Sequence, residues 1–447
     1  MKLTARDEQL MKFTFLDYRQ SAEFIQEPLV INKAEGLYYW DREGRRYFDA
    51  IGGIFVAVLG HRHPRVMEAM RQQMEMITFT PPLHAISDVT LNFIEKLGAV
   101  TPGNLDYVKP YSGGSESTES ALKFSLQYHK QTGHPAKYKF LSLYMGYHGA
   151  TFGAMAASGT GKRKTKFEPL PGGFIKLFSP LHYRDKFPSW EEANRFSARM
   201  FEDVMVSEDP ETIAGVIVEP ISNTGGIMTP TEEFFRILRA ICDRYKVLLI
   251  FDEVITGYAR TGNMFAAQTI GVTPDIICAG KGLSSGAMPL GAMMARADMA
   301  DAFFGPEHAE IQFAHGHTFA GNPLASAVGL AVIDEIIENK LEKKAQILGE
   351  YLAGKLEGLK KFGVIREVRG RGALRGVELV KNTKSMEPFN ELGLALKKTS
   401  LKNGLIMRIN PNWFAVAPAL IAEQSDIDEM VSLIEKSLQE ALTMVKA

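Results

Sequence analysis

Apolar and polar positions follow two alternating patterns along the chain. Short apolar runs, often β-branched and bounded by turn residues, alternate with longer segments in which apolar residues recur at helical spacing. This alternation predicts an α/β fold in which a mainly parallel sheet has helices on both faces. The expected strands are 105–109, 138–144, 215–218, 247–251 and 276–278, and the expected helices are 115–132, 232–245 and 325–338.

The pattern changes near residue 340. A charged helical stretch, short predicted strands at 364–369, 374–380 and 415–417 and a terminal helix over 426–445 suit a smaller α+β domain. The early segment 36–49 resembles a hairpin and is expected to join it. We therefore assign residues 1–60 and 331–447, the two chain ends, to the small domain and residues 61–330 to the large one.

The composition is that of a globular protein without a dominant charge. Hydrophobic residues make up 45% and charged residues 23% of the 447 residues, which excludes wholesale disorder. The 51 Lys and Arg nearly balance the 52 Asp and Glu, so the chain has no excess positive charge that would attract nucleic acid or an acidic membrane. A small-molecule partner is expected.

Cysteine content and apolar run length indicate the compartment. Cys242 and Cys278, the two cysteines of the sequence, lie in apolar runs and are interpreted as buried thiols in a reducing environment. The N-terminal region lacks a signal-peptide pattern, and no apolar stretch reaches the roughly 20 residues that span a bilayer. We expect a cytoplasmic protein without membrane contact.

Asp252 and Lys281 carry the most specific chemical signal. Asp252 directly follows an apolar run, and Lys281 lies downstream among small residues. A pyridoxal phosphate enzyme needs such a pair, because the acid keeps the pyridine nitrogen protonated and the lysine holds the cofactor as an imine. The residues alone also allow a second interpretation, in which Asp252 caps the next helix and Lys281 is a solvated loop residue.

Three other segments offer ligand-binding groups. The turn at 112–117, Ser-Gly-Gly-Ser-Glu-Ser, opens a predicted helix whose free N–H groups suit a phosphate, although taken alone an ordinary turn is the simpler interpretation. Tyr147 is suited to stack on a ring or to pack at a sheet edge, and Thr318 offers a loop hydroxyl. The histidines at 61, 63, 315 and 317 lack a metal-binding pattern, so we predict no metal.

Taken in order, six strings closely resemble the motifs of class III aminotransferases. This family is the branch of fold-type I pyridoxal phosphate enzymes that includes the ω-amino acid:pyruvate aminotransferases. The resemblance runs from about residue 29 to the terminal helix. The strings are Gly114-Ser115, Tyr147-His148-Gly149, Glu219-Pro220, Asp252-Glu253-Val254, Lys281 and Thr318.

The resemblance implies a role for each residue around pyridoxal 5'-phosphate. Gly114 and Ser115 are expected to bind the phosphate, together with Thr318 of a neighbouring subunit, which implies a homodimer with shared sites. Lys281 is expected to carry the cofactor as a Schiff base and to move the proton in the 1,3-shift of transamination.

The remaining cofactor contacts follow from the same resemblance. Tyr147 is expected on one face of the ring, where it would also contact the substrate, and Val254 is expected on the other. His148 is also expected to bind the cofactor. Asp252 is expected at the ring nitrogen, with Glu219 supporting the array from behind.

The substrate side is less determined. Arg408 resembles the arginine that binds a substrate carboxylate in this family, but an edge-strand surface residue is its plain alternative. Thr224 stands where glutamate-using members carry an acid, which points to pyruvate as the acceptor. Phe55 and Phe79 are expected as aromatic walls for an amine, although core packing is the commoner role of such residues.

The expected reaction moves an amino group from an ω-amino acid or primary amine donor to pyruvate or a similar 2-oxo acid acceptor. A decarboxylase, racemase or aminomutase that uses the same cofactor on the same fold is the alternative. A dinucleotide-dependent oxidoreductase or a binding module conflicts with the missing glycine fingerprint and with Lys281.

Overall fold

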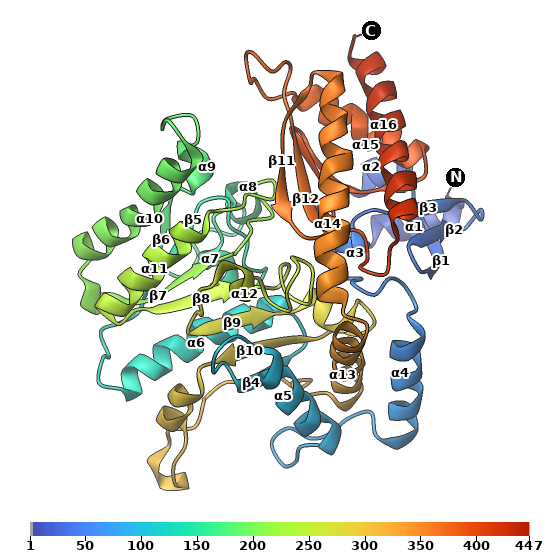
Figure 1. Ribbon diagram of the computed structural model, residues 1–447. Helices are drawn as coiled ribbons and strands as arrows, with labels where there is room; N and C mark the ends of the chain where they lie inside the picture. The colour runs from blue at the N-terminus through green and yellow to red at the C-terminus, as the bar shows by residue number, and fades with distance from the viewer. Residues whose placement is uncertain (1–2, 447) are drawn as a thin grey trace.

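A seven-stranded sheet forms the centre of the structure, a computed structural model that describes residues 3–446 (Figure 1). Its strand order is β4-β10-β9-β8-β7-β5-β6, and within these seven described strands β10 alone runs antiparallel to its neighbours. The strands are β4 (Tyr107–Tyr111), β5 (Lys139–Leu143), β6 (Phe174–Leu177), β7 (Ile213–Val218), β8 (Leu248–Asp252), β9 (Ile276–Ala279) and β10 (Gly291–Ala295).

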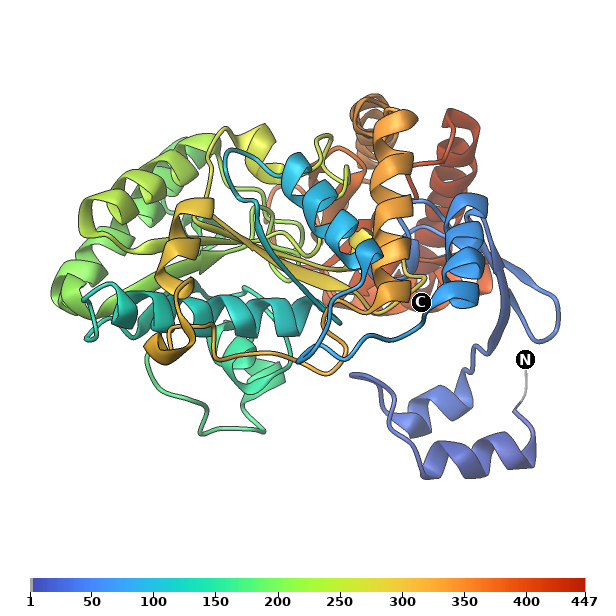
Figure 2. The ribbon, with the colours of Figure 1, turned by 90° about the horizontal axis from the view of Figure 1, so that it is seen from below.

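Helices cover both faces of this sheet. Figures 1 and 2 show α10 and α11 on one face and α6 on the other. The helices of this part are α4 (Pro64–Met76), α5 (Asp88–Val100), α6 (Gly114–Gln131), α7 (Phe152–Ala157), α8 (Gly161–Lys164), α9 (Pro180–Tyr183), α10 (Trp190–Ser207), α11 (Glu232–Tyr245), α12 (Ala266–Ile270) and α13 (Pro323–Glu338).

Most of the predicted elements are confirmed. The five expected strands and the three expected helices all form, each with ends within two residues of the expected limits. Sequence patterning missed β6, which has four residues, and β10. The string Gly-Ala-Met-Met-Ala of β10 is fully buried but has no β-branched or aromatic side chain, so it gave no strand signal.

The alternation of side chains along β8 decides where its final acid points. Leu249 and Phe251 belong to the core under α10 and α11, whereas Leu248 and Ile250 belong to the core under α6. Because side chains alternate between the two faces of a strand, Asp252 follows Leu248 and Ile250 onto the α6 face. The acid therefore lies on the side from which α6 begins.

The direction of the parallel strands brings distant residues together. Strands β5, β7, β8 and β9 all end at one edge of the sheet. Tyr147 follows β5, Glu219 follows β7, Asp252 ends β8, and Lys281 follows β9. Gly114 begins α6 just beyond β4 at the same edge. Ligands of open α/β sheets bind at this carboxyl edge, so the fold itself assembles the candidate site.

Two four-stranded sheets lie beside the large one. One joins the chain ends, because β13 pairs in parallel with β3, and the expected hairpin is formed by β2 and β3. The other has the order β11-β12-β15-β14. Their strands are β1 (Ile31–Glu35), β2 (Tyr38–Asp41), β3 (Arg46–Asp49), β11 (Ile365–Arg371), β12 (Leu374–Leu379), β13 (Leu405–Ile406), β14 (Arg408–Asn410) and β15 (Trp413–Val416).

The expected domain limits stay a prediction, and α13 bears on them. This helix crosses residues 330 and 331 without a break, and its Val332 and Ile336 belong to the large core. The small-domain core gathers around α14 (Leu341–Glu357), α15 (Asn390–Lys402) and α16 (Gln424–Lys446).

An N-terminal arm, residues 3–28, stands off the body in Figure 2. It holds α1 (Ala5–Lys12) and α2 (Ser21–Gln26), and the short α3 (Gly52–Phe55) follows later. Ion pairs tie the arm to the body, from Asp7 to Arg42 at 2.6 Å and from Glu23 to Lys397 at 3.2 Å. Among residues 3–446, no helix is long and apolar enough to cross a membrane.

The close approach of α14 to the turn after β11 predicts a stability effect. A Cβ at Gly349 would lie 2.2 Å from the carbonyl oxygen of Gly372, whereas one at Gly354 on the same helix meets nothing within 4 Å. Gly349→Ala should therefore lower the melting temperature by about 5 °C or more, and Gly354→Ala should leave it unchanged or slightly raise it. Equal melting curves for the two variants, measured by differential scanning fluorimetry, would contradict the packing described.

Candidate active site

A cavity of about 150 Å³ lies at the carboxyl edge of the large sheet. It combines one lysine, two acids, an aromatic ring and the start of a helix, a combination suited to covalent and acid–base chemistry. Its walls are Gly114, Ser115, Tyr147, His148, Gly149, Glu219, Ile221, Asp252, Val254, Ile255 and Lys281.

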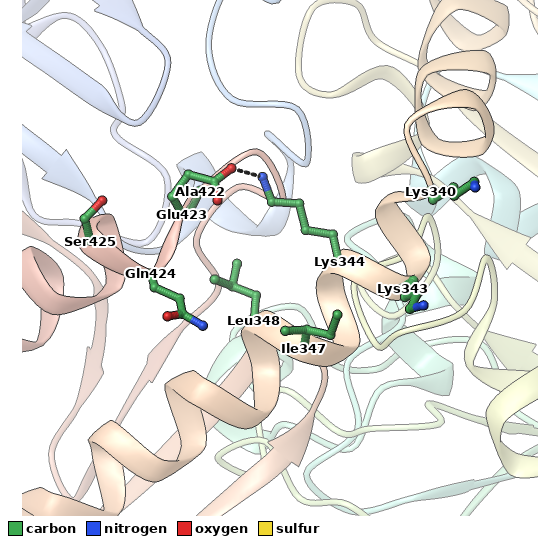
Figure 3. Close-up of a pocket in the computed structure, with 9 residues that line it drawn as sticks. All are labelled: Lys340, Lys343, Lys344, Ile347, Leu348, Ala422, Glu423, Gln424 and Ser425. Carbon is green, nitrogen blue, oxygen red and sulfur yellow. Dashed lines mark hydrogen bonds and ion pairs between the residues drawn. The ribbon is translucent and has the colours of Figure 1, made fainter.

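A second hollow, between α14 and the start of α16, differs in kind (Figure 3). Three lysines and Glu423 line it, and Lys344 pairs with Glu423 across its rim. The hollow is a wide groove, and Lys344 and Glu423 keep 29% and 70% of their side-chain surface exposed. Solvated charges of this kind have no need of a ligand, so the smaller cavity is the better candidate for chemistry.

Asp252 is held by its neighbours at the floor of the cavity. The buried His148 donates from Nδ1 to Asp252 Oδ2 at 2.8 Å, and the Val254 amide donates to Oδ1 at 3.1 Å. His148 is itself fixed, because its amide donates to Ser158 Oγ at 2.8 Å. The carboxylate therefore has one orientation, and His148 lies beside the acid as its support.

The neighbouring acid, Glu253, serves the fold. It points to the opposite side of the strand end and accepts the amides of Ala266 and Ala267, at 2.7 and 2.8 Å, at the first turn of α12. The second interpretation of the sequence made Asp252 the cap of the next helix, but Glu253 has that role. Side chains alternate along a strand, so the two acids point to different faces.

Lys281 lies where its amine is easily deprotonated. Its side chain lines the cavity, and desolvation by the surrounding protein lowers its pKa, while the charges of Asp252 and Glu219 oppose that shift. Within the described part of the chain, no group forms a hydrogen bond or ion pair with its amine. A lysine with a lowered pKa and no partner is suited to attack a carbonyl group.

Two glycines allow the start of α6 to reach the cavity. A Cβ at Gly280 would lie 3.2 Å from the backbone of Gly114, so its absence lets the end of β9 approach the start of α6 closely. Gly114 begins that helix, and the Ser115 hydroxyl accepts the Ala150 amide at 3.1 Å. First-turn amides and a hydroxyl form a suitable anion site.

Glu219 holds the backbone of Tyr147 by a hydrogen bond. Its carboxylate accepts the amides of Tyr147 and Asn223, at 3.1 and 3.2 Å, and the Ser222 hydroxyl at 3.2 Å. Burial raises the pKa of Glu219 to about 7, with a further contribution from the charge of Asp252. The loop that carries the aromatic ring is therefore fixed to the end of β7.

Arg408 lies near the cavity without an acid partner. Its guanidinium lies 5.5 Å from the centre of the Trp413 ring, and its buried Nε has no hydrogen bond. Burial lowers the pKa of Arg408 to about 10, and the charge of Arg408 in turn lowers the pKa of Lys281. Within residues 3–446, no carboxylate lies within 4.0 Å of it.

Three expected site residues lie away from the cavity, namely Phe55, Phe79 and Thr318. Phe55 is 1% exposed and belongs to a core cluster with Ile221. Phe79 is 43% exposed and meets Phe319, with ring centres 6.1 Å apart, on the loop that also carries Thr318. Their expected roles therefore stay predictions.

Sequence reasoning missed two residues of the wall. Ile221 and Ile255 line the cavity next to motif residues, Ile221 just after Glu219-Pro220 and Ile255 just after Val254. An apolar residue directly after a site motif is the signal that could have identified both.

The family model for Aminotransferase class-III matches residues 20–438. The chain belongs to this family. It is a pyridoxal phosphate-dependent transaminase of fold-type I, and the resemblance seen in its motifs is confirmed.

The sequences of curated relatives align with this chain over almost their whole length. An uncharacterized aminotransferase of Bacillus subtilis is 36% identical, covering 98% of this chain and 96% of its own. An omega-aminotransferase of Caulobacter vibrioides is 33% identical, covering 95% and 96%. A putrescine–pyruvate aminotransferase of Pseudomonas aeruginosa is 30% identical, covering 99% and 96%.

Solved structures show the same fold. An (S)-enantioselective omega-transaminase from Thermomicrobium roseum superimposes with a TM-score of 0.93 at 33% identity, covering 99% of this chain and all of that one. An omega-transaminase from Pseudomonas jessenii, solved in complex with PMP, gives a TM-score of 0.92 at 30% identity, covering 99% of each chain.

The cavity fits the family cofactor. The α6 amides and the Ser115 hydroxyl suit its phosphate, Asp252 suits its ring nitrogen, and the unpartnered amine of Lys281 suits its aldehyde. The glycines keep the cradle open, because a Cβ at Gly114 would lie 2.8 Å from Val254.

That contact predicts the outcome of a small substitution. Gly114→Ala should push Val254 into the cavity and raise the dissociation constant for pyridoxal phosphate about tenfold. Gly113→Ala is the matched control, since a Cβ there meets nothing within 4 Å and its φ of −177° suits any residue. Fluorescence titration of both apoproteins with pyridoxal phosphate measures the difference. Equal affinities would argue against a cofactor site between Gly114 and Val254.

Proposed function

We propose that this transaminase uses pyruvate, or a similar 2-oxo acid, as the acceptor and an ω-amino acid or primary amine as the donor. The observation that carries the proposal is the unpaired guanidinium of Arg408 beside the cavity. A carboxylate of the acceptor would pair with it. Thr224, whose hydroxyl donates to the Met145 carbonyl, supplies no competing negative charge. The names of two relatives, an omega-aminotransferase and a putrescine–pyruvate aminotransferase, support the same assignment.

The roles of the chain's own residues follow from their positions. When bound, pyridoxal phosphate supplies an electron sink for the substrate carbon. Asp252, fixed by His148, would hold a proton at the ring nitrogen. Lys281 would carry the proton between the substrate carbon and the cofactor carbon. Tyr147 and Val254 would cover the two ring faces.

A homodimer with shared sites is the second part of the proposal. Thr318 and Phe79 lie on one exposed surface, where the Asn322 amide group donates to the Thr78 carbonyl at 2.9 Å. Large apolar side chains are exposed there, Met76 at 79%, Leu83 at 91% and Phe319 at 61%. Such surfaces mark association sites, and burying this one against a second copy would bring Thr318 to the copy's phosphate.

A cytoplasmic location completes the proposal. Cys242 and Cys278 are both free and buried, and burial raises the pKa of both thiols. Protonated, buried thiols fit a protein that works in a reducing compartment.

The proposed role of Lys281 predicts a complete loss of activity. Lys281→Ala removes the amine that would carry both cofactor and proton, so turnover of 1-phenylethylamine with pyruvate should fall by about a thousandfold or more. Lys343→Ala, at an exposed lysine of the open groove, is the control and should keep wild-type rates. Substantial transamination by a folded Lys281→Ala protein would refute the assignment.

Arg408→Ala tests the acceptor assignment separately. Loss of a charged hydrogen-bond donor to the carboxylate should raise the Michaelis constant for pyruvate about 10- to 100-fold. The constant for 1-phenylethylamine, which has no carboxylate, should change by about twofold at most. Steady-state kinetics with each substrate varied in turn separate the two effects, and equal shifts would exclude Arg408 as the carboxylate site.

A further inference from the structure

The N-terminal arm reaches the candidate active site through one side chain. Tyr18, on the turn between α1 and α2, lies with its hydroxyl 3.3 Å from the hydroxyl of Tyr147. Tyr18 is 68% exposed, and Figure 2 shows the arm standing off the body. A contact with a cavity residue is therefore made by the N-terminal arm.

Arg163 completes this contact from α8. Its guanidinium carbon lies 4.4 Å from the ring centre of Tyr18 and 4.7 Å from that of Tyr147. Within the described residues, no carboxylate lies within 4.0 Å of Arg163. The positive charge is thus directed at two aromatic faces, an arrangement in which each ring attracts the cation.

The segment that carries Arg163 is fixed to the Tyr147 loop. The Gly159 amide and the Thr160 hydroxyl both donate to the Gly146 carbonyl, at 2.9 and 3.0 Å. The position of Arg163 therefore follows that of the loop, whereas Tyr18 comes from outside it. Burial and the hydrogen bond with Tyr18 raise the pKa of Tyr147 to about 12, so its hydroxyl stays protonated and able to bond.

We propose that Tyr18 and Arg163 are positioning residues that hold the Tyr147 ring against the cavity, which makes the N-terminal arm part of the active site. Arg163 lies outside the cavity wall and Tyr147 lies in it, so the pair acts through Tyr147. The inference rests on the proposed function, in which Tyr147 covers the cofactor ring. A looser Tyr147 would weaken cofactor binding and slow turnover for every donor alike.

Four variants of the holoenzyme test this. Arg163→Gln removes the charge, Arg163→Lys keeps it, Tyr18→Ala removes the ring, and Tyr18→Phe removes the hydroxyl alone. Arg46→Gln is the matched control, because Arg46 lies 4.4 Å from the Tyr38 ring centre and neither residue lines the cavity. The measurements are the dissociation constant for pyridoxal phosphate and the kinetic constants for 1-phenylethylamine and β-alanine with pyruvate.

Positioning predicts a common effect on both donors. Arg163→Gln and Tyr18→Ala should raise the cofactor dissociation constant about five- to tenfold and lower kcat for both donors by one shared factor. Arg163→Lys should restore most of the loss, and Tyr18→Phe should show about a twofold effect. The control should match the wild type.

Two results would overturn the inference. Cofactor affinity and kcat equal to wild type in all four variants would show that the arm only rests on the site. A rise in the Michaelis constant for β-alanine alone, with unchanged cofactor affinity, would make Arg163 a carboxylate site. A wild-type protein that binds pyridoxal phosphate but transfers no amino group from either donor to pyruvate would instead refute the proposed function.

Discussion

The fixed position of Asp252 at the carboxyl edge of the sheet is the constraint on which the site depends. The acid is oriented by His148 at 2.8 Å and by the Val254 amide, and the alternation of β8 directs it to the face where α6 begins. Parallel strands deliver Tyr147, Glu219 and Lys281 to the same edge. The position and orientation of this acid thus follow from strand direction and from one buried histidine.

A low lysine pKa alone does not identify the catalytic residue. Burial also lowers the pKa of another lysine, Lys176, which reaches about 7, but the amine of Lys176 donates to the Ala156 carbonyl at 2.7 Å. Lys281 differs because its amine has no partner among the described residues and because it shares a cavity with Asp252. The surroundings of the two amines decide which is available for chemistry.

Local patterns were sufficient for most of the fold. Buried strands such as β8 have continuous apolar runs, and α11 was found with its observed limits. Strand β10 was missed because small and Met residues give no strand signal. The ordered motifs pointed to Lys281, Asp252 and Tyr147, and all three lie at or just after the carboxyl end of a strand, in one cavity.

Residues brought to the site by long-range packing could not be predicted in this way. Tyr18 and Arg163 lie 129 and 16 positions from Tyr147 and belong to no motif. Phe55, which the sequence suggested as a wall, is buried in a core cluster with Ile221, and its expected role stays a prediction. Side-chain direction in loops depends on tertiary contacts that spacing does not encode.

Chemical trapping tests the central claim most directly. The yellow holoenzyme would be reduced with borohydride, digested and mapped by mass spectrometry to locate the phosphopyridoxyl group. The account predicts the label on Lys281, and its loss from that peptide when an amine donor is added before reduction. A label on Lys176 or on any other lysine would contradict it.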